Sequence, residues 1–108
     1  KLLNVNNAFL CLDTGNYVMQ GFDIISAVYN LKNYIAHIHI KDRDGDGNNV
    51  PLGKGIIEFG EVFNALNKIN YKGLFTTETD RGLDPQITAK ENLSLLKSLI
   101  EKGVNSYA

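Results

Sequence analysis

The stretch YIAHIHIK at residues 34–41 gives the clearest indication of the fold. It is apolar and rich in β-branched and aromatic residues, which is typical of a buried strand. Two further stretches share this character, AFLCLD at residues 8–13 and GLFTTE at residues 73–78. Apolar residues at helical spacing follow each of the three, so the predicted order is β-α-β-α-β-α. This alternation predicts an α/β fold, with helices packed on a parallel sheet.

The helical segments are recognised by apolar stripes and by signals at their ends. The third helix is expected to begin at Asp84-Pro85, an N-cap residue followed by a first-turn proline, and to end just before Gly103. The three buried faces are expected to consist of Phe22, Ile25, Val28 and Leu31; of Phe59, Val62, Phe63, Leu66 and Ile69; and of Ala89, Leu93, Leu96 and Ile100.

Composition and charge argue against several classes of protein. The 108 residues are 44% hydrophobic and 21% charged, with a net charge of −1, which suits one globular core. The sequence has no basic patch that would predict nucleic-acid binding. It also has no apolar run of the ~20 residues that a membrane span needs. The only cysteine, Cys11, cannot form an internal disulfide and fits a reducing cytoplasm.

Each predicted strand ends in a residue that can bind a metal: Asp13, His39 and Glu78. In parallel α/β folds, the carboxyl ends of the strands gather at one edge, where ligands bind. Two carboxylates and an imidazole suit Mn²⁺, Zn²⁺ or Co²⁺. A carboxylate at a strand end is also commonly a helix cap or turn residue. Spacing alone therefore leaves both a metal site and a capping role open.

Other polar residues near these ends each have two interpretations. His37 lies two residues before His39 and shares its face, which favours a supporting or packing role over ligation. Asn16 could bind a substrate hydroxyl, or it could be a turn residue after Gly15. Lys41 and Lys54 could meet a substrate phosphate, or they could simply be solvated.

Residues 42–54, DRDGDGNNVPLGK, are predicted to form one long irregular loop. Loops of this length inside a domain are usually functional or mobile. Asp42, Asp44 and Asp46 match the first half of an EF-hand calcium loop. However, Gly53 stands where the bidentate glutamate belongs, and a strand precedes the loop instead of a helix. A solvated, turn-rich loop is therefore favoured over calcium binding.

Three βα units can form a small open domain or part of a larger barrel, and composition does not decide between them. The segments LDTGN (12–16), HIKD (39–42) and VPLGKG (50–55), together with Glu78, resemble the second half of the xylose-isomerase-like TIM barrels. They are most similar to the L-ribulose-5-phosphate (L-xylulose-5-phosphate) 3-epimerases. The resemblance implies that residues 1–108 are the C-terminal portion of one barrel domain, its strands six to eight with their helices. Residues 1–3 then look like the end of a preceding helix.

The resemblance also implies a metal centre and a reaction. Asp13, His39 and Glu78 would bind one divalent ion (Mn, Zn or Co), together with a glutamate on a fifth strand expected before Lys1. Removal of the proton next to a ketose carbonyl would give an enediolate, with Glu78 and the other glutamate acting as the two bases. The implied protein is a cytoplasmic, homo-oligomeric isomerase or epimerase of sugars or sugar phosphates, inactive without the rest of the barrel. Free-ketose epimerases usually have histidine where Asn16 stands, which favours a phosphorylated substrate.

Three other functions are alternatives to this one. A lyase of the inosose dehydratase type would also remove a proton next to a carbonyl over a metal. A nuclease like endonuclease IV would need a histidine three residues after Asp13, where Asn16 stands, so it is disfavoured. A non-catalytic α/β interaction domain would use the strand-end residues as caps and would bind no metal.

Overall fold

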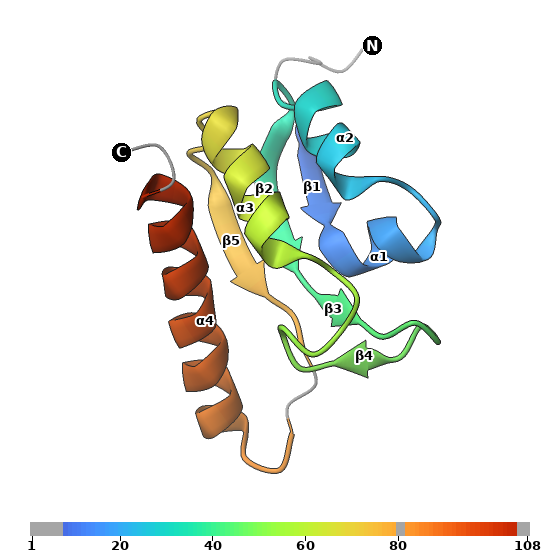
Figure 1. The fold of residues 1–108 in the computed structure, drawn as a ribbon, viewed down its shortest axis with the longest axis vertical. Coiled ribbons are helices and arrows are strands. Elements are labelled where there is room, and N and C mark those ends of the chain that lie inside the picture. Colours follow the sequence, from blue (N-terminus) through green and yellow to red (C-terminus); the bar gives the residue numbers. More distant parts are fainter. Residues whose placement is uncertain (1–7, 80–81, 106–108) are drawn as a thin grey trace, which may run out of the picture.

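The computed structural model describes residues 8–79 and 82–105 of the chain, the side chains of 103–105 excepted. Its main sheet consists of β1 (Leu10–Asp13), β2 (Ile35–Ile40) and β5 (Leu74–Thr77), in the order β1-β2-β5 (Figure 1). Both strand pairs are parallel. The three strands lie inside the predicted ranges, which confirms the α/β class. The helix end predicted at residues 1–3 lies outside the described residues.

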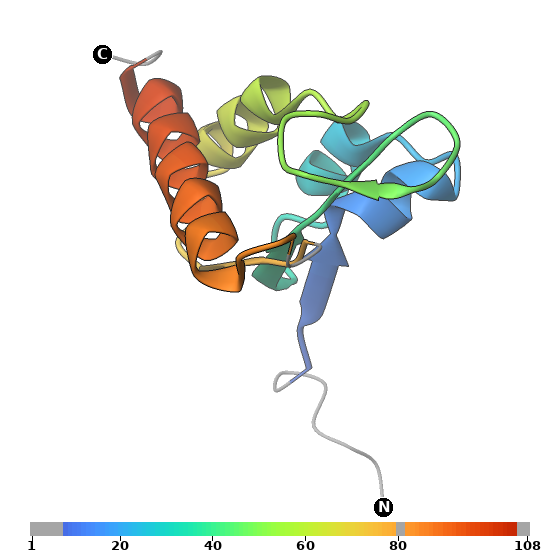
Figure 2. The same ribbon diagram turned by 90° about the horizontal axis from the view of Figure 1, so that it is seen from below.

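The helices of the described chain are α1 (Thr14–Met19), α2 (Ile24–Asn30), α3 (Phe59–Lys68) and α4 (Pro85–Asn105). They lie on one side of the sheet, and none of them covers the opposite face (Figure 2). The core fills the space between this helix layer and the sheet. Its buried members include Leu12, Ile38 and Ile40 from the strands, Val28 from α2, and Phe59, Val62, Phe63 and Leu66 from α3.

The apolar stripe of α3 is buried as predicted, because its members recur once per helical turn and face the sheet. Ile69, just beyond the helix, packs against the same core. Burying a large aliphatic or aromatic side chain contributes about 1.5–3 kcal/mol. This stripe therefore fixes α3 over the strands that carry the candidate site.

The segment between β1 and β2 folds into two helices, where a single stripe was predicted. Gly21 has a left-handed φ of +81° that ends the α1 region. Asp23 then starts α2, since its carboxylate accepts a hydrogen bond from the Ile25 N–H at 3.0 Å. Phe22 lies between the two helices and is 59% exposed, so its predicted burial was wrong. Val28 is buried, and Ile25 and Leu31 pack against the core as predicted.

α4 begins as predicted and extends further than predicted. Its start is capped by Asp84, whose carboxylate accepts a hydrogen bond from the Gln86 N–H at 3.0 Å. The helix runs on to Asn105, so Gly103 lies within it and does not follow its end. Within the described residues no helix, α4 included, is both long and apolar enough to cross a membrane.

The buried face of α4 was predicted only in part. Leu96 is buried, but Ala89, Leu93 and Ile100 are exposed. The residues that pack inward are Asn92, Leu95, Leu96 and Leu99. The Asn92 amide donates a hydrogen bond to the Thr79 hydroxyl at 2.7 Å. Two overlapping apolar stripes run along the helix. The one that faces the core lies on the same side as this buried hydrogen bond.

Residues 42–54 are more ordered than the predicted irregular loop. They contain an antiparallel ribbon of β3 (Asp42–Arg43) and β4 (Asn49–Val50), in which Asp42 pairs with Val50. The turn between the strands is closed by Asp44, which accepts a hydrogen bond from the Asn48 N–H at 2.9 Å. Asp44 therefore stabilises the turn between β3 and β4.

Candidate metal centre

Asp13, His39 and Glu78 converge at the carboxyl edge of the sheet. Asp13 ends β1 and is the register partner of His39 on β2, while Glu78 directly follows β5. One potential ligand atom from each residue lies within 4.8 Å of the others. His39 Nδ1 is 2.9 Å from Glu78 Oε2. The side chains that the three strand ends were expected to bring together are thus adjacent.

Lys41 lies among the same carboxylates. Its Nζ is 3.3 Å from Glu78 Oε1 and 3.9 Å from Asp13 Oδ2, and its side chain is only 13% exposed. A Cβ at Gly15 would approach Lys41 Cγ to 2.8 Å, so glycine allows the lysine stem to lie against α1. Lys41, and to a smaller extent His39, lower the pKa of the Glu78 carboxyl below its ordinary value. Glu78 is therefore an anion at neutral pH.

Thr14 joins the ends of β1 and β2 just behind these side chains. Its buried hydroxyl donates a hydrogen bond to the Lys41 carbonyl at 2.6 Å and accepts one from the Lys41 N–H at 2.9 Å. This pair of bonds fixes Lys41 relative to Asp13. Sequence reasoning missed Thr14, although its position immediately after a strand-end carboxylate was a usable signal.

Asp42 organises the loop that follows β2. Its side chain is buried, and one carboxylate oxygen accepts hydrogen bonds from the N–H groups of Gly53 at 3.0 Å and Gly55 at 2.9 Å. The other oxygen accepts from the Arg43 N–H at 2.9 Å. Both oxygens of Asp42 thus accept hydrogen bonds from backbone N–H groups.

Asn16 was predicted either to bind substrate or to occupy a turn, and it lies in the first turn of α1. Its N–H donates to Asp13 Oδ1 at 2.9 Å, so Asp13 also caps this helix. Its side-chain oxygen accepts a hydrogen bond from Arg43 Nη2 at 2.8 Å, which places a guanidinium beside the site. Sequence reasoning missed Arg43. Lys54, by contrast, is exposed and forms no ion pair with the described residues.

His37 lies one step further from the carboxyl edge, on the same face as His39. The two rings meet edge to face with their centroids 4.9 Å apart, and His37 Nε2 is 2.5 Å from the Thr76 hydroxyl oxygen. His37 therefore contacts the ring of a candidate ligand and is itself held by β5. This arrangement is compatible with the supporting role predicted for it.

The donor set fits a divalent cation. Two ligands bound to one ion at ~2.1 Å can be at most ~4.2 Å apart. The candidate ligand atoms lie within 4.8 Å of one another, so small side-chain adjustments would bring them onto one ion. One imidazole and two carboxylates form a mixed N/O set of the kind that binds Mn²⁺, Co²⁺ or Zn²⁺. The ammonium group of Lys41 partly neutralises the charges of Asp13 and Glu78. It would therefore compete with a metal ion for these two carboxylates.

Comparison with known proteins supports the fold and the family. Residues 2–99 match the model of the xylose isomerase-like TIM barrel family. The Escherichia coli protein SgbU, provisionally named L-ribulose-5-phosphate 3-epimerase, is 33% identical over 82 residues, which cover 68% of this chain and 29% of that protein. The inosose dehydratase of Clostridium beijerinckii is 29% identical over 108 residues, which cover 81% of this chain and 36% of that enzyme.

A solved structure shows the same arrangement of elements. A xylose isomerase domain protein from Planctomyces limnophilus superposes with a TM-score of 0.79 at 28% identity, over 94% of this chain and 41% of that one. The chain spans about a third of the length of the curated relatives it matches. Its parallel sheet with helices on one side corresponds to part of a barrel, and the chain belongs to the xylose isomerase-like TIM barrel family.

Proposed function

We propose that the protein containing this chain is a divalent-metal-dependent isomerase or epimerase of sugars or sugar phosphates. It transfers a proton at the carbon next to a carbonyl. The observation that carries the proposal is the convergence of Asp13, His39 and Glu78 within 4.8 Å at the carboxyl edge of a parallel sheet. Active sites in barrels of this type lie at that edge. The name of the relative SgbU supports the same class of reaction.

In this proposal, Asp13, His39 and Glu78 hold one divalent ion, whose identity among Mn²⁺, Zn²⁺ and Co²⁺ is left open. When bound, such an ion supplies Lewis acidity, which makes a proton next to a sugar carbonyl easier to remove. The interaction of Asp13 with the α1 N-terminus and that of His39 with Glu78 orient these ligands before any ion arrives.

Glu78 is the proposed base of this chain. One of its oxygens faces Lys41 and the other faces His39, and its lowered pKa keeps the carboxylate deprotonated at neutral pH. A second carboxylate across the sugar must return the proton on the other face for epimerisation. By the family resemblance, this second carboxylate is a glutamate on the fifth strand of the barrel. The same resemblance assigns residues 1–108 to strands six to eight.

Substrate contacts are proposed for Asn16, Lys41 and Lys54. Lys41 borders the candidate ligands, and Arg43 adds a second cation through its bond to Asn16. Together the two cations favour a phosphorylated substrate. Lys54 is exposed on the loop after β4 and would need that loop to approach the substrate. A cytoplasmic location is part of this proposal and rests on the free thiol of Cys11.

A lyase of the inosose dehydratase type is the second candidate, favoured by the match to the Clostridium enzyme over most of this chain. It would use the same base for the first proton transfer and would then expel a hydroxyl group. The two functions are separated by the product, since an epimerase returns an isomer of equal mass and a dehydratase releases water.

The test is solvent exchange in the intact protein. With a pentulose 5-phosphate in D₂O and added Mn²⁺, Glu78→Gln should reduce deuterium incorporation next to the carbonyl by about 10²–10⁴-fold, since a base is lost and the metal site weakened. Glu61→Gln, a matched change on the exposed first turn of α3, should exchange at the wild-type rate. Circular dichroism controls for folding. Exchange at the wild-type rate in Glu78→Gln would exclude Glu78 as the base.

A further inference from the structure

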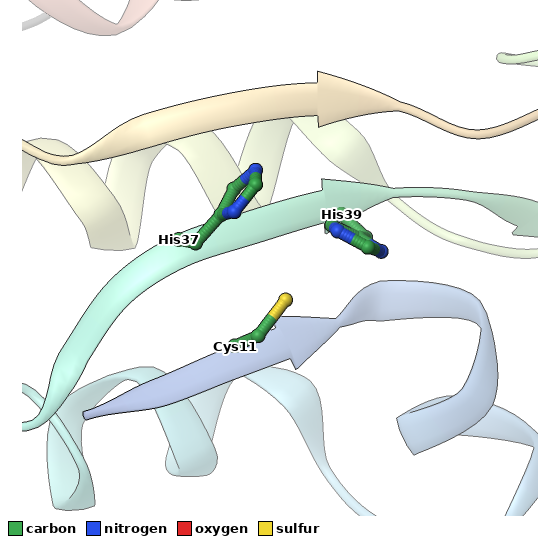
Figure 3. Close-up of side chains that lie close together, drawn as sticks. All are labelled: Cys11, His37 and His39. Atoms are coloured by element: carbon green, nitrogen blue, oxygen red, sulfur yellow. The ribbon is translucent and has the colours of Figure 1, made fainter. Parts of the chain in front are cut away.

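A second group of metal-binding side chains lies beside the candidate metal centre. Cys11, His37 and His39 project from the sheet face that no described helix covers (Figure 3). Cys11 is the register partner of His37 across β1 and β2, and His39 follows two residues later on the same face. One potential ligand atom from each of the three lies within 4.8 Å of the others.

The chemistry of this group differs from that of the carboxylate site. A thiolate and two imidazoles form a soft donor set, which selects Zn²⁺, Cd²⁺ or Co²⁺ over Mn²⁺ and Mg²⁺. Zinc accepts such a set, with its fourth position left to water. The carboxylate-rich set of Asp13 and Glu78 lacks sulfur and suits harder cations. Two neighbouring sites of different preference thus share one residue, His39.

Both histidine rings are already held in place for binding. His37 Nε2 is in contact with the Thr76 hydroxyl, which leaves Nδ1 for a ligand. Metal-binding histidines generally hold their second nitrogen in this way, and the contact fixes the ring orientation. In the tautomer whose Nε2–H donates to the Thr76 hydroxyl, Nδ1 has a free lone pair for an ion. His39 is held through Nδ1 by Glu78. The Cys11 sulfur lies on the open face of the sheet beside both rings and is not covered by the described helices.

We infer that Cys11, His37 and His39 form a second cation site, for a thiophilic divalent ion such as Zn²⁺ or Cd²⁺. This ion competes with the one at Asp13, His39 and Glu78. A neutral imidazole has a single acceptor nitrogen, so His39 serves one ion at a time. The thiolate site stands on the geometry alone, and the competition rests on the proposed metal centre.

Co²⁺ is the probe for the thiolate site, because cobalt bound to a thiolate gives a charge-transfer band in the near ultraviolet. Titration of the reduced, intact protein with Co²⁺ should produce this band. Cys11→Ser should abolish it. Thr76→Val removes only the partner of His37 and should weaken the cobalt affinity by about 10–100-fold. No band in the wild type, or an unchanged affinity in Thr76→Val and in His37→Gln, would overturn the site.

Mn²⁺ is the probe for the competition. Mn²⁺ binding is followed by the paramagnetic resonance of the free ion. Once Mn²⁺ saturates its site, the cobalt–thiolate band should weaken in the wild type. It should leave the band unchanged in Asp13→Asn, which lacks a ligand of the carboxylate site only. Bound Mn²⁺ with an undiminished band would refute the sharing of His39. If the band forms but Mn²⁺ never binds, the proposed function fails at its metal centre and the thiolate site remains.

Discussion

Replacing Lys41 with methionine should strengthen divalent-cation binding at Asp13, His39 and Glu78. The lysine ammonium lies 3.3 Å from one carboxylate of that set and 3.9 Å from the other. An incoming cation must therefore displace or repel a charge that already compensates its ligands. Methionine keeps most of the apolar stem that packs against Gly15 and removes only this charge.

The size of the effect follows from these separations. Two unit charges about 4 Å apart interact by about 1 kcal/mol in water, and pairs between solvent-exposed groups measure about 0.2–1 kcal/mol. Because Glu78 is half exposed, the lower, screened values apply to its pair with Lys41. The two pairs together give about 0.5–1.5 kcal/mol, which corresponds to roughly a two- to tenfold gain in affinity.

The assay is a titration of the purified protein with Mn²⁺, in which free Mn²⁺ is measured by paramagnetic resonance. Lys54→Met is the matched control, since Lys54 is exposed and its substitution should leave the affinity unchanged. Lys41→Arg keeps the charge and should show no gain. In 1 M salt, where the screening length falls to about 3 Å, the gain of Lys41→Met should shrink.

The pH dependence provides an independent check on the sign. Lys41 lowers the pKa of Glu78, so Lys41→Met should return that pKa towards its ordinary value. Protonation of Glu78 then competes with the metal at a higher pH, and the affinity gain should be largest near neutrality and decline as the pH falls. Equal or weaker Mn²⁺ binding in Lys41→Met at neutral pH would refute the idea that Lys41 competes with the cation.

Three further outcomes are expected. Asp42→Ala should lower the free energy of unfolding by about 3–6 kcal/mol, since its buried carboxylate accepts two long-range N–H bonds worth about 1.5–3 kcal/mol each; chemical denaturation should show a much smaller loss for the exposed turn residue Asp44→Ala. Gly15→Ala should push the Lys41 stem aside and reproduce part of the Mn²⁺ gain of Lys41→Met, and a wild-type affinity would contradict this. The 108-residue chain alone should self-associate in sedimentation velocity, because β1 and β5 each pair with a described strand on one side only and Leu74 is 69% exposed; a monomer with a cooperative melt would contradict it.

The strands and the meeting of their ends could be predicted from the sequence because both depend on local patterns. Apolar runs mark the strands, and parallel strands separated by helices bring their carboxyl ends to one edge whatever the details of packing. The face of α4 could not be predicted in the same way. Leu93 and Leu95 belong to two apolar stripes that overlap on the helix, and the sequence does not show which of them faces the core. The stripe with Leu95 is buried, and on that side Asn92 bonds to Thr79, a residue 13 positions away.

The polar framework of the candidate site was harder to predict, because its contacts join residues far apart in the chain. Thr14 binds the backbone of Lys41, which is 27 positions away, and Asp42 binds an N–H 13 positions away. The local sequence places both residues next to strand ends, but it does not identify their distant partners. Lys41 was expected either to meet a substrate phosphate or to be solvated. Its pairing with Asp13 and Glu78 excludes the solvated lysine and leaves the phosphate contact untested.

One irregularity in the sheet decides whether the site exists at all. Leu10 pairs with Ile35 but Cys11 pairs with His37, so Ala36 is an extra residue in β2. Without it, the register set by Leu10 would place Asp13 beside Ile38, whose side chain is fully buried under the helices. A shift of one residue reverses every side chain of a strand, and a bulge achieves this within a single strand. The sequence of β2, with His37 and His39 two residues apart, does not indicate which register β2 adopts with β1. The proximity of Asp13 to His39 therefore depends on how the two strands pair, and the sequence of neither strand alone predicts it.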